Sequence, residues 1–111
     1  MQYLNTYLKK ITDRGNTKLA ESISKTAEDV GDKYIKTFSF SEHQIGLLFG
    51  NVQSGKTGQM FGIMCKAADL GFPVFVLLTT DNVVLQQQTL DRVKSDLEGF
   101  CICGENDARL F

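Results

Sequence analysis

The chain has 111 residues and a mass of 12.4 kDa, which suffices for one domain and is small for an enzyme. Hydrophobic residues make up 42% of the chain and charged residues 23%, and this composition excludes a largely disordered protein. The net charge of -1 excludes a strongly basic nucleic-acid-binding arm, and no apolar run is long enough to span a membrane.

We interpret residues 1–44 as a helical N-terminal segment followed by a linker. Apolar residues recur at helical spacing on both sides of Gly15, which predicts two helices with a break between them. Gly31 is expected to end the second helix. Residues 34–40 alternate between apolar and polar types, a pattern typical of an exposed strand or an extended linker.

From residue 45 to residue 111 the pattern changes to alternating strands and helices. Two stretches have amphipathic helical spacing, residues 57–68 and 83–97. Three short apolar runs have the length and composition of buried strands: residues 45–49, 74–78 and 100–103. The order strand, helix, strand, helix, strand predicts an α/β fold in which part of a parallel sheet follows the N-terminal helical segment.

Residues 50–57 read GNVQSGKT and match the phosphate-binding pattern G-x-x-x-x-G-K-[ST]. The two glycines allow backbone angles that turn successive N–H groups inward to form an anion-binding nest. Lys56 is expected to carry positive charge to the β and γ phosphates, and the Thr57 hydroxyl to ligate Mg²⁺. The motif therefore predicts nucleoside-triphosphate binding. The predicted nucleotide-binding residues are Gly50, Gln53, Ser54, Gly55, Lys56 and Thr57.

A hydrolase of this class also needs an acidic residue at the end of another strand to hold Mg²⁺. Asp81, Glu105 and Asp107 are candidates, each with the alternative of a loop or helix-cap position. Residues 96–99 spell the D-x-x-G of GTPases but have a helical pattern, and no N-K-x-D follows them. We assign no catalytic residue within the chain. We expect the chain to be the N-terminal part of a longer protein, truncated before its metal-binding carboxylate.

The chain resembles the first half of a RecA-like motor domain of superfamily 2 helicases, the DEAD/DEAH type, over roughly residues 45–98. Two stretches carry the resemblance: GLLFGNVQSGKTGQM and VFVLLTTDNVVLQQQTLDRV. The segment VQSGKT, together with the later Gln88-Thr89 pair, is most similar to the helicase-like family of proposed endonucleases called the Z-one domain.

This resemblance implies a RecA-like P-loop fold, with ATP and Mg²⁺ as cofactors and DNA as a partner. It implies nucleic-acid contacts by Thr79, Thr80, Gln87 and Gln88. The family's D-E-x-x box and second motor domain do not occur within the 111 residues. The implied function is thus ATP binding as the N-terminal part of a helicase-like DNA-dependent ATPase, without turnover by this chain alone.

Two alternatives from other classes remain open. A small nucleotide-kinase-type phosphotransferase would share the loop, but it needs several arginines to clamp phosphates and only Arg92 and Arg109 follow the loop. A truncated, non-catalytic nucleotide- or partner-binding module would expose apolar surface around residues 74–78 or 100–103. We expect the partner to be the rest of a longer chain or a second copy, with no membrane involved.

The remaining polar and sulfur-containing residues indicate no further site. Cys65, Cys101 and Cys103 are expected to be reduced thiols, and with no signal peptide this predicts a cytoplasmic protein. His43 is expected in a loop. A Gln upstream of the phosphate loop reads adenine in some helicases of the family, but Gln44 lies closer to Gly50 than that role usually allows. We expect Gln44 to be a surface residue.

Overall fold

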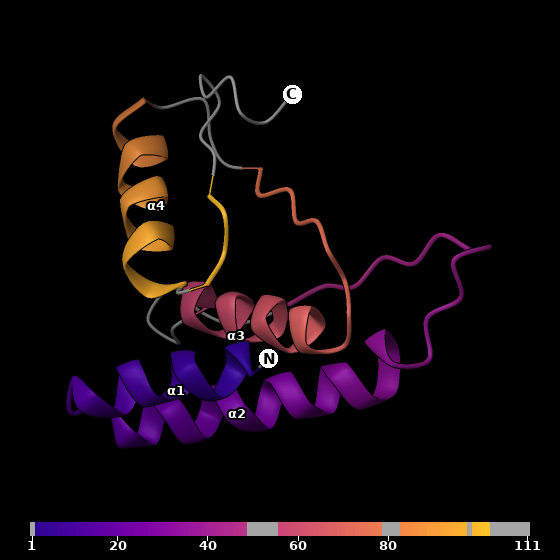
Figure 1. Ribbon diagram of the computed structural model, residues 1–111, viewed down its shortest axis with the longest axis horizontal. Coiled ribbons are helices and arrows are strands. Elements are labelled where there is room, and N and C mark those ends of the chain that lie inside the picture. The colour runs from indigo at the N-terminus through magenta and orange to yellow at the C-terminus, as the bar shows by residue number, and fades with distance from the viewer. Residues whose placement is uncertain (1, 49–55, 79–82, 98, 103–111) are drawn as a thin grey trace. The chain divides into compact units, whose positions relative to one another are not determined.

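The computed structural model of the protein describes residues 2–48, 56–78, 83–97 and 99–102. The chain divides into two compact units, Met1–Phe75 and Val76–Phe111, and each is described here by itself. The first unit contains α1 (Tyr3–Asp13), α2 (Thr17–Val30), the π-helix η1 (Gly31–Ile35) and α3 (Lys56–Asp69) (Figure 1). The second contains α4 (Val83–Asp96).

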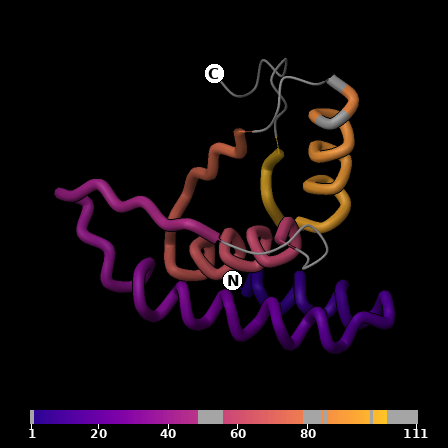
Figure 2. The backbone as a smooth tube through the Cα atoms, turned by 180° about the vertical axis from the view of Figure 1, so that it is seen from behind, coloured from indigo at the N-terminus to yellow at the C-terminus, as the bar shows by residue number. Residues whose placement is uncertain are grey.

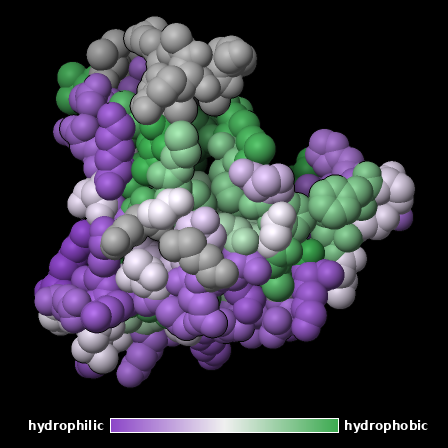
Figure 3. Space-filling view, in the orientation of Figure 1, coloured by the Kyte–Doolittle hydropathy of each residue, from purple (hydrophilic) through white to green (hydrophobic). Residues whose placement is uncertain are grey.

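The first two helices form an antiparallel hairpin around Gly15, whose φ of 88° suits glycine, so the predicted break is confirmed. Each helix buries one apolar stripe at the spacing that the sequence predicts. The buried residues are Leu4, Tyr7 and Ile11 on α1 and Ala20, Ile23 and Ala27 on α2. Hydrophilic side chains cover most of the α1–α2 surface seen in Figure 3. The hairpin thus has one apolar side and one polar side.

The third helix supplies the other half of the core, and it packs against both α1 and α2 (Figures 1 and 2). Phe61 is fully buried, and its ring lies edge-on to that of Tyr7 with centroids 6.3 Å apart. Gly62 allows α3 to approach α2 closely, because a methyl group there would overlap the Ile23 side chain. Gly71, with a φ of 99°, follows the end of α3 as predicted.

The predicted α/β sheet is wrong for the part of the chain that the structure describes, which is all-α with four α-helices and no strand. The three expected strands appear as non-helical chain at residues 45–48, 74–78 and 100–102. Their apolar side chains stay largely uncovered, with Leu47 85% and Leu78 86% exposed. An apolar run has the composition of a strand, but it forms one only when a second segment pairs with its backbone.

Two smaller expectations about the linker are also wrong. Gly31 does not end the helical run, because it has a helical φ of -59° and begins η1. Its missing side chain serves close packing instead, since a Cβ at Gly31 would lie 2.6 Å from the Lys66 Cγ. Tyr34 and Ile35 belong to η1 rather than to an extended strand.

The second unit confirms the helix expected over residues 83–97. Its α4 covers Val83–Asp96, with Val93 on its buried side and Leu97 buried just after it. Gly99, which has a φ of 90°, follows as the predicted stop. The periodicity here therefore predicts the helix and its end correctly.

Candidate functional site

Lys56 and Thr57, the last two residues of the phosphate-binding pattern, are the first two residues of α3. Both are half-buried, and the first turn of this 14-residue helix contains no acidic side chain. Among the described residues, no carboxylate pairs with Lys56. The first N–H groups of any helix have no partner within it, and they lie at the positive end of the helix dipole. This end of α3 therefore combines the features that favour a bound phosphate.

The rest of the predicted loop lies outside the described residues. This applies to Gly50, Gln53, Ser54 and Gly55, so their expected contacts with phosphate stay predictions. What the structure places is the point at which the loop enters the helix. Lys56 and Thr57 begin a helix, as the motif requires, whereas residues 45–48 before the loop do not form the strand expected there.

The first turn of α3 is anchored to the hairpin by two hydrogen bonds. The Tyr7 hydroxyl donates to the Gly58 carbonyl oxygen over 3.1 Å, and Tyr7 is almost fully buried. The Gln59 Nε2 donates to the Ser22 Oγ over 2.9 Å. The Gln59 Oε1 is buried without a hydrogen-bond partner among the described residues. The helix start is therefore held by α1 and α2 on the side that faces the core.

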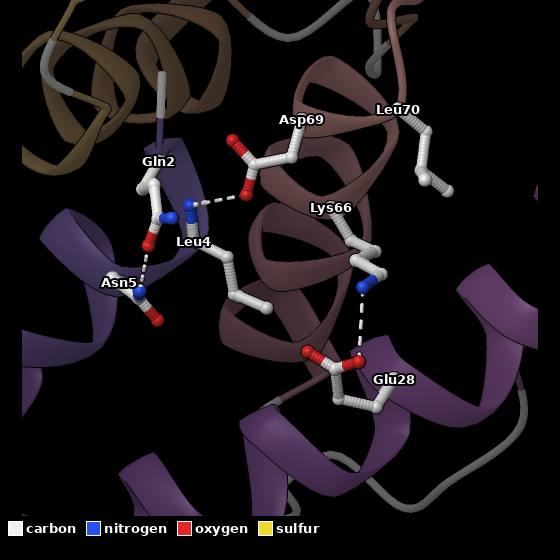
Figure 4. A pocket seen from close by; sticks show the side chains of 7 residues that line it. All are labelled: Gln2, Leu4, Asn5, Glu28, Lys66, Asp69 and Leu70. Carbon is white, nitrogen blue, oxygen red and sulfur yellow. Dashed lines mark hydrogen bonds and ion pairs between the residues drawn. The ribbon is translucent and has the colours of Figure 1, made fainter.

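The other end of α3 lines a hollow of about 420 Å³ that contains several polar side chains (Figure 4). The Asp69 carboxylate accepts hydrogen bonds from the backbone N–H groups of Tyr3, over 2.7 Å, and Leu4, over 3.2 Å. The Lys66 Nζ lies 2.9 Å from a carboxylate oxygen of Glu28, and this hydrogen bond raises the pKa of Lys66. These charged groups already bind one another or the backbone. They hold the helices together and are not available to bind a ligand.

A second hollow of about 560 Å³ is lined mainly by apolar side chains of η1, of residues 44–48 and of Ile63. Gln44 lies at its rim as an exposed residue, which confirms the expected surface position. Tyr34, also in the lining, is 54% exposed. The described residues give this groove one side-chain amide and no charged group, so it lacks the chemistry that would hold phosphates.

The residues predicted to contact nucleic acid fall in the second unit or outside the described residues. Thr79 and Thr80 are outside them. Gln87 and Gln88 lie on α4 with exposed side chains. The Gln87 Nε2 donates to the Asp91 Oδ1 over 2.9 Å, one turn along the same helix. The Gln87 amide is thus already used within α4, while Gln88 faces solvent.

The candidates for a metal-binding carboxylate gain no support. Asp81, Glu105 and Asp107 lie outside the described residues. Within the described ranges, no group of three or more His, Cys, Asp or Glu side chains could hold a metal ion. Asp96, the acidic residue of the D-x-x-G pattern, is buried and pairs with Arg92 one turn earlier at 3.5 Å. This ion pair indicates a structural role within α4.

The two cysteines that the structure describes differ in burial. Cys65 is buried in the core, and burial raises the pKa of its thiol to about 12, with a further contribution from the Asp69 charge. Cys101 is exposed. Both are free thiols, as predicted, and Cys103 lies outside the described residues. A thiol with so high a pKa is a poor nucleophile and a poor metal ligand at neutral pH.

Sequence reasoning missed the groups that join α3 to the hairpin: Tyr7, Ser22, Gln59 and Asp69. Asp69 could have been noticed, because a carboxylate at the C-terminal end of its own helix meets an unfavourable dipole. Such a placement indicates a partner elsewhere, here the start of α1. Nothing in the spacing indicates that the Tyr7 hydroxyl reaches Gly58, 51 residues later.

Comparisons with protein-family models, with curated proteins and with solved structures found no match. Within the described ranges, no helix combines the length and apolar character needed to cross a bilayer.

Proposed function

We propose that the chain binds the triphosphate of ATP at the start of α3. The observation that carries the proposal is the match of residues 50–57 to the phosphate-binding pattern, with Lys56 and Thr57 as the first residues of a long helix. Backbone N–H groups and the dipole at that end favour an anion, and Lys56 adds a full positive charge. The first turn has no acidic side chain to oppose the phosphates.

Mg²⁺ would arrive with the triphosphate and take Thr57 as its one ligand from the described residues. A threonine hydroxyl suits this ion, which prefers oxygen ligands and keeps several waters and phosphate oxygens in its shell. When bound, Mg²⁺ neutralises charge on the β and γ phosphates. The D-E-x-x box of the helicase family does not occur within the 111 residues, so we expect nucleotide binding with little or no turnover by this chain.

The larger setting that we propose is the N-terminal part of a helicase-like, DNA-dependent ATPase. Its support is the resemblance over roughly residues 45–98, which extends past the motif into α4. Gln88, for which the resemblance implies a nucleic-acid contact, has an exposed side chain on α4. Weaker ATP binding by a Gln88→Ala variant only in the presence of single-stranded DNA would support this setting. Identical binding with and without DNA would argue against it.

The test of the proposed function is a titration of the full chain with Mg-ATP by calorimetry. Lys56→Ala should weaken binding at least tenfold, because the charge that meets the β and γ phosphates is removed. Lys9→Ala is the matched control, since Lys9 is an exposed lysine on α1 and its loss changes the net charge equally. No measurable binding by the wild-type chain, or equal binding by both variants, would disprove the proposal.

A second candidate is a non-catalytic module that binds a partner or a second copy. The observation that favours it is the exposed apolar chain at residues 45–48, where Ile45 and Leu47 are both 85% exposed. Sedimentation over a range of concentrations, combined with the Mg-ATP titration, separates the two candidates. Association without nucleotide binding would favour the module, and a monomer that binds Mg-ATP would favour the first proposal.

A further inference from the structure

The phosphate-binding end of α3 is joined to the N-terminal hairpin by polar contacts that a merely apolar core would not need. Tyr7 lies on α1 and is only 1% exposed, yet its hydroxyl is directed at the backbone of the first turn of α3. The acceptor is the carbonyl oxygen of Gly58, the residue that directly follows Thr57 in the chain. The Gln59 side chain makes the second contact, to Ser22 on α2.

We propose that Tyr7 is a positioning residue that couples nucleotide binding at the start of α3 to docking of the α1–α2 hairpin. This inference rests on the proposed function, since it concerns the same phosphate site. Backbone N–H groups bind a phosphate well only when their direction is fixed before the ligand arrives. The peptide unit of Gly58 is part of that first turn, and Tyr7 holds it from the side opposite to solvent.

The ring and the hydroxyl of Tyr7 have separate tasks. The ring packs edge-on against Phe61 and belongs to the core. The hydroxyl contributes little to filling space, and its hydrogen bond to Gly58 is a polar link between α1 and the helix start. Tyr7→Phe therefore keeps the core packing and removes the link. The change isolates positioning from folding as far as one substitution can.

Coupling of this kind acts in both directions. If the hydroxyl fixes the first turn of α3, then a bound nucleotide must in turn stabilise the docked hairpin. Residues 3–13 make up α1 and contain no part of the phosphate motif. Slower amide hydrogen exchange in α1 upon addition of Mg-ATP would thus report the link itself rather than direct contact with the ligand.

The experiment compares three full-length chains: wild type, Tyr7→Phe and the matched control Tyr34→Phe, whose side chain is 54% exposed. Mg-ATP affinity is measured by calorimetry at a temperature where circular dichroism shows all three equally folded. Tyr7→Phe should bind roughly three- to tenfold more weakly, the range that one hydrogen bond can supply. Tyr34→Phe should bind like wild type. Mg-ATP should slow exchange in α1 of the wild type, and Tyr7→Phe should lose that slowing.

The outcomes separate this inference from the proposed function. Binding by the wild type with equal affinity in Tyr7→Phe, or with unchanged exchange in α1, overturns the inference and leaves the phosphate site standing. Absence of Mg-ATP binding by the wild type overturns both. If Tyr7→Phe does not fold, Ser22→Ala removes the second contact, between Ser22 on α2 and Gln59, and the same loss of affinity is required of it, with the slowing of exchange now followed in α2.

Discussion

At the start of α3, Lys56 and Thr57 stand beside backbone N–H groups that the helix leaves without partners, whereas at its end Lys66 and Asp69 already bind α2 and α1. Both ends have a lysine and an oxygen-bearing side chain, so composition does not distinguish them. The difference lies in what surrounds them. The end of α3 holds the helices together, whereas at its start no carboxylate of the described residues pairs with Lys56.

Substitutions at the end of α3 should therefore change the stability of the fold and not the nucleotide affinity, and Lys56→Ala should do the reverse. The core between the two ends should affect both.

Phe61→Ala should cost about 3–5 kcal/mol, because a fully buried aromatic side chain is lost from the contact between α3 and the hairpin. Urea unfolding followed by circular dichroism measures the loss. Phe40→Ala is the control: Phe40 is 82% exposed and its ring contacts Phe38 and Phe72, so its loss should cost less than about 1.5 kcal/mol. Equal losses in the two variants would mean that α3 does not form the core described here.

Asp69→Ala should lower the free energy of unfolding by about 0.5–2 kcal/mol, as expected for the loss of a helix N-cap. Chemical denaturation measures this loss, and calorimetry with Mg-ATP should detect no change in affinity. Asp69→Asn is the conservative control, since it retains an acceptor oxygen and should lose less. A marked loss of Mg-ATP affinity in Asp69→Ala would break the proposed division between the two ends.

Lys66→Gln should have the smallest effect, about 0.2–1 kcal/mol, because its ion pair with Glu28 is partly exposed. The hydrogen bond to Glu28 raises the pKa of Lys66 above its ordinary value of 10.5. The pair therefore stabilises the fold fully below pH 10.5, and the stabilisation disappears as pH rises through the higher folded-state pKa. Denaturation at pH 8 and above pH 11 should show the wild-type advantage over Lys66→Gln shrinking. An advantage that is constant with pH would contradict the ion pair.

The helices could be predicted from the sequence because each contains its own signal. Leu4, Tyr7 and Ile11 recur on one face, and positive φ at Gly15 and Gly71 separates the elements as expected. The three strands predicted from the sequence do not form within the described residues, because pairing depends on a second segment that periodicity does not reveal. The exposed residues Ile45, Leu47 and Val76 have strand-like composition in chain that forms no strand within the described ranges.

The candidate site also has one part that the sequence predicts and one part that it does not. The motif predicts Lys56 and Thr57 at the start of a helix, and the structure confirms their helical position. The contacts that fix this helix start, from Tyr7 and Ser22, join residues 51 and 37 positions apart. No local pattern contains that information, because helix packing alone brings those residues together.

The burial of Cys65 gives the protein an internal reporter of its own opening. A thiol with a pKa of about 12 reacts with alkylating reagents very slowly at neutral pH, so modification requires the surrounding helices to separate first. Cys101 is exposed and is expected to be modified at once, which supplies an internal standard in the same molecule. The ratio of the two labelling rates, followed by mass spectrometry, then measures how often α3 separates from the hairpin.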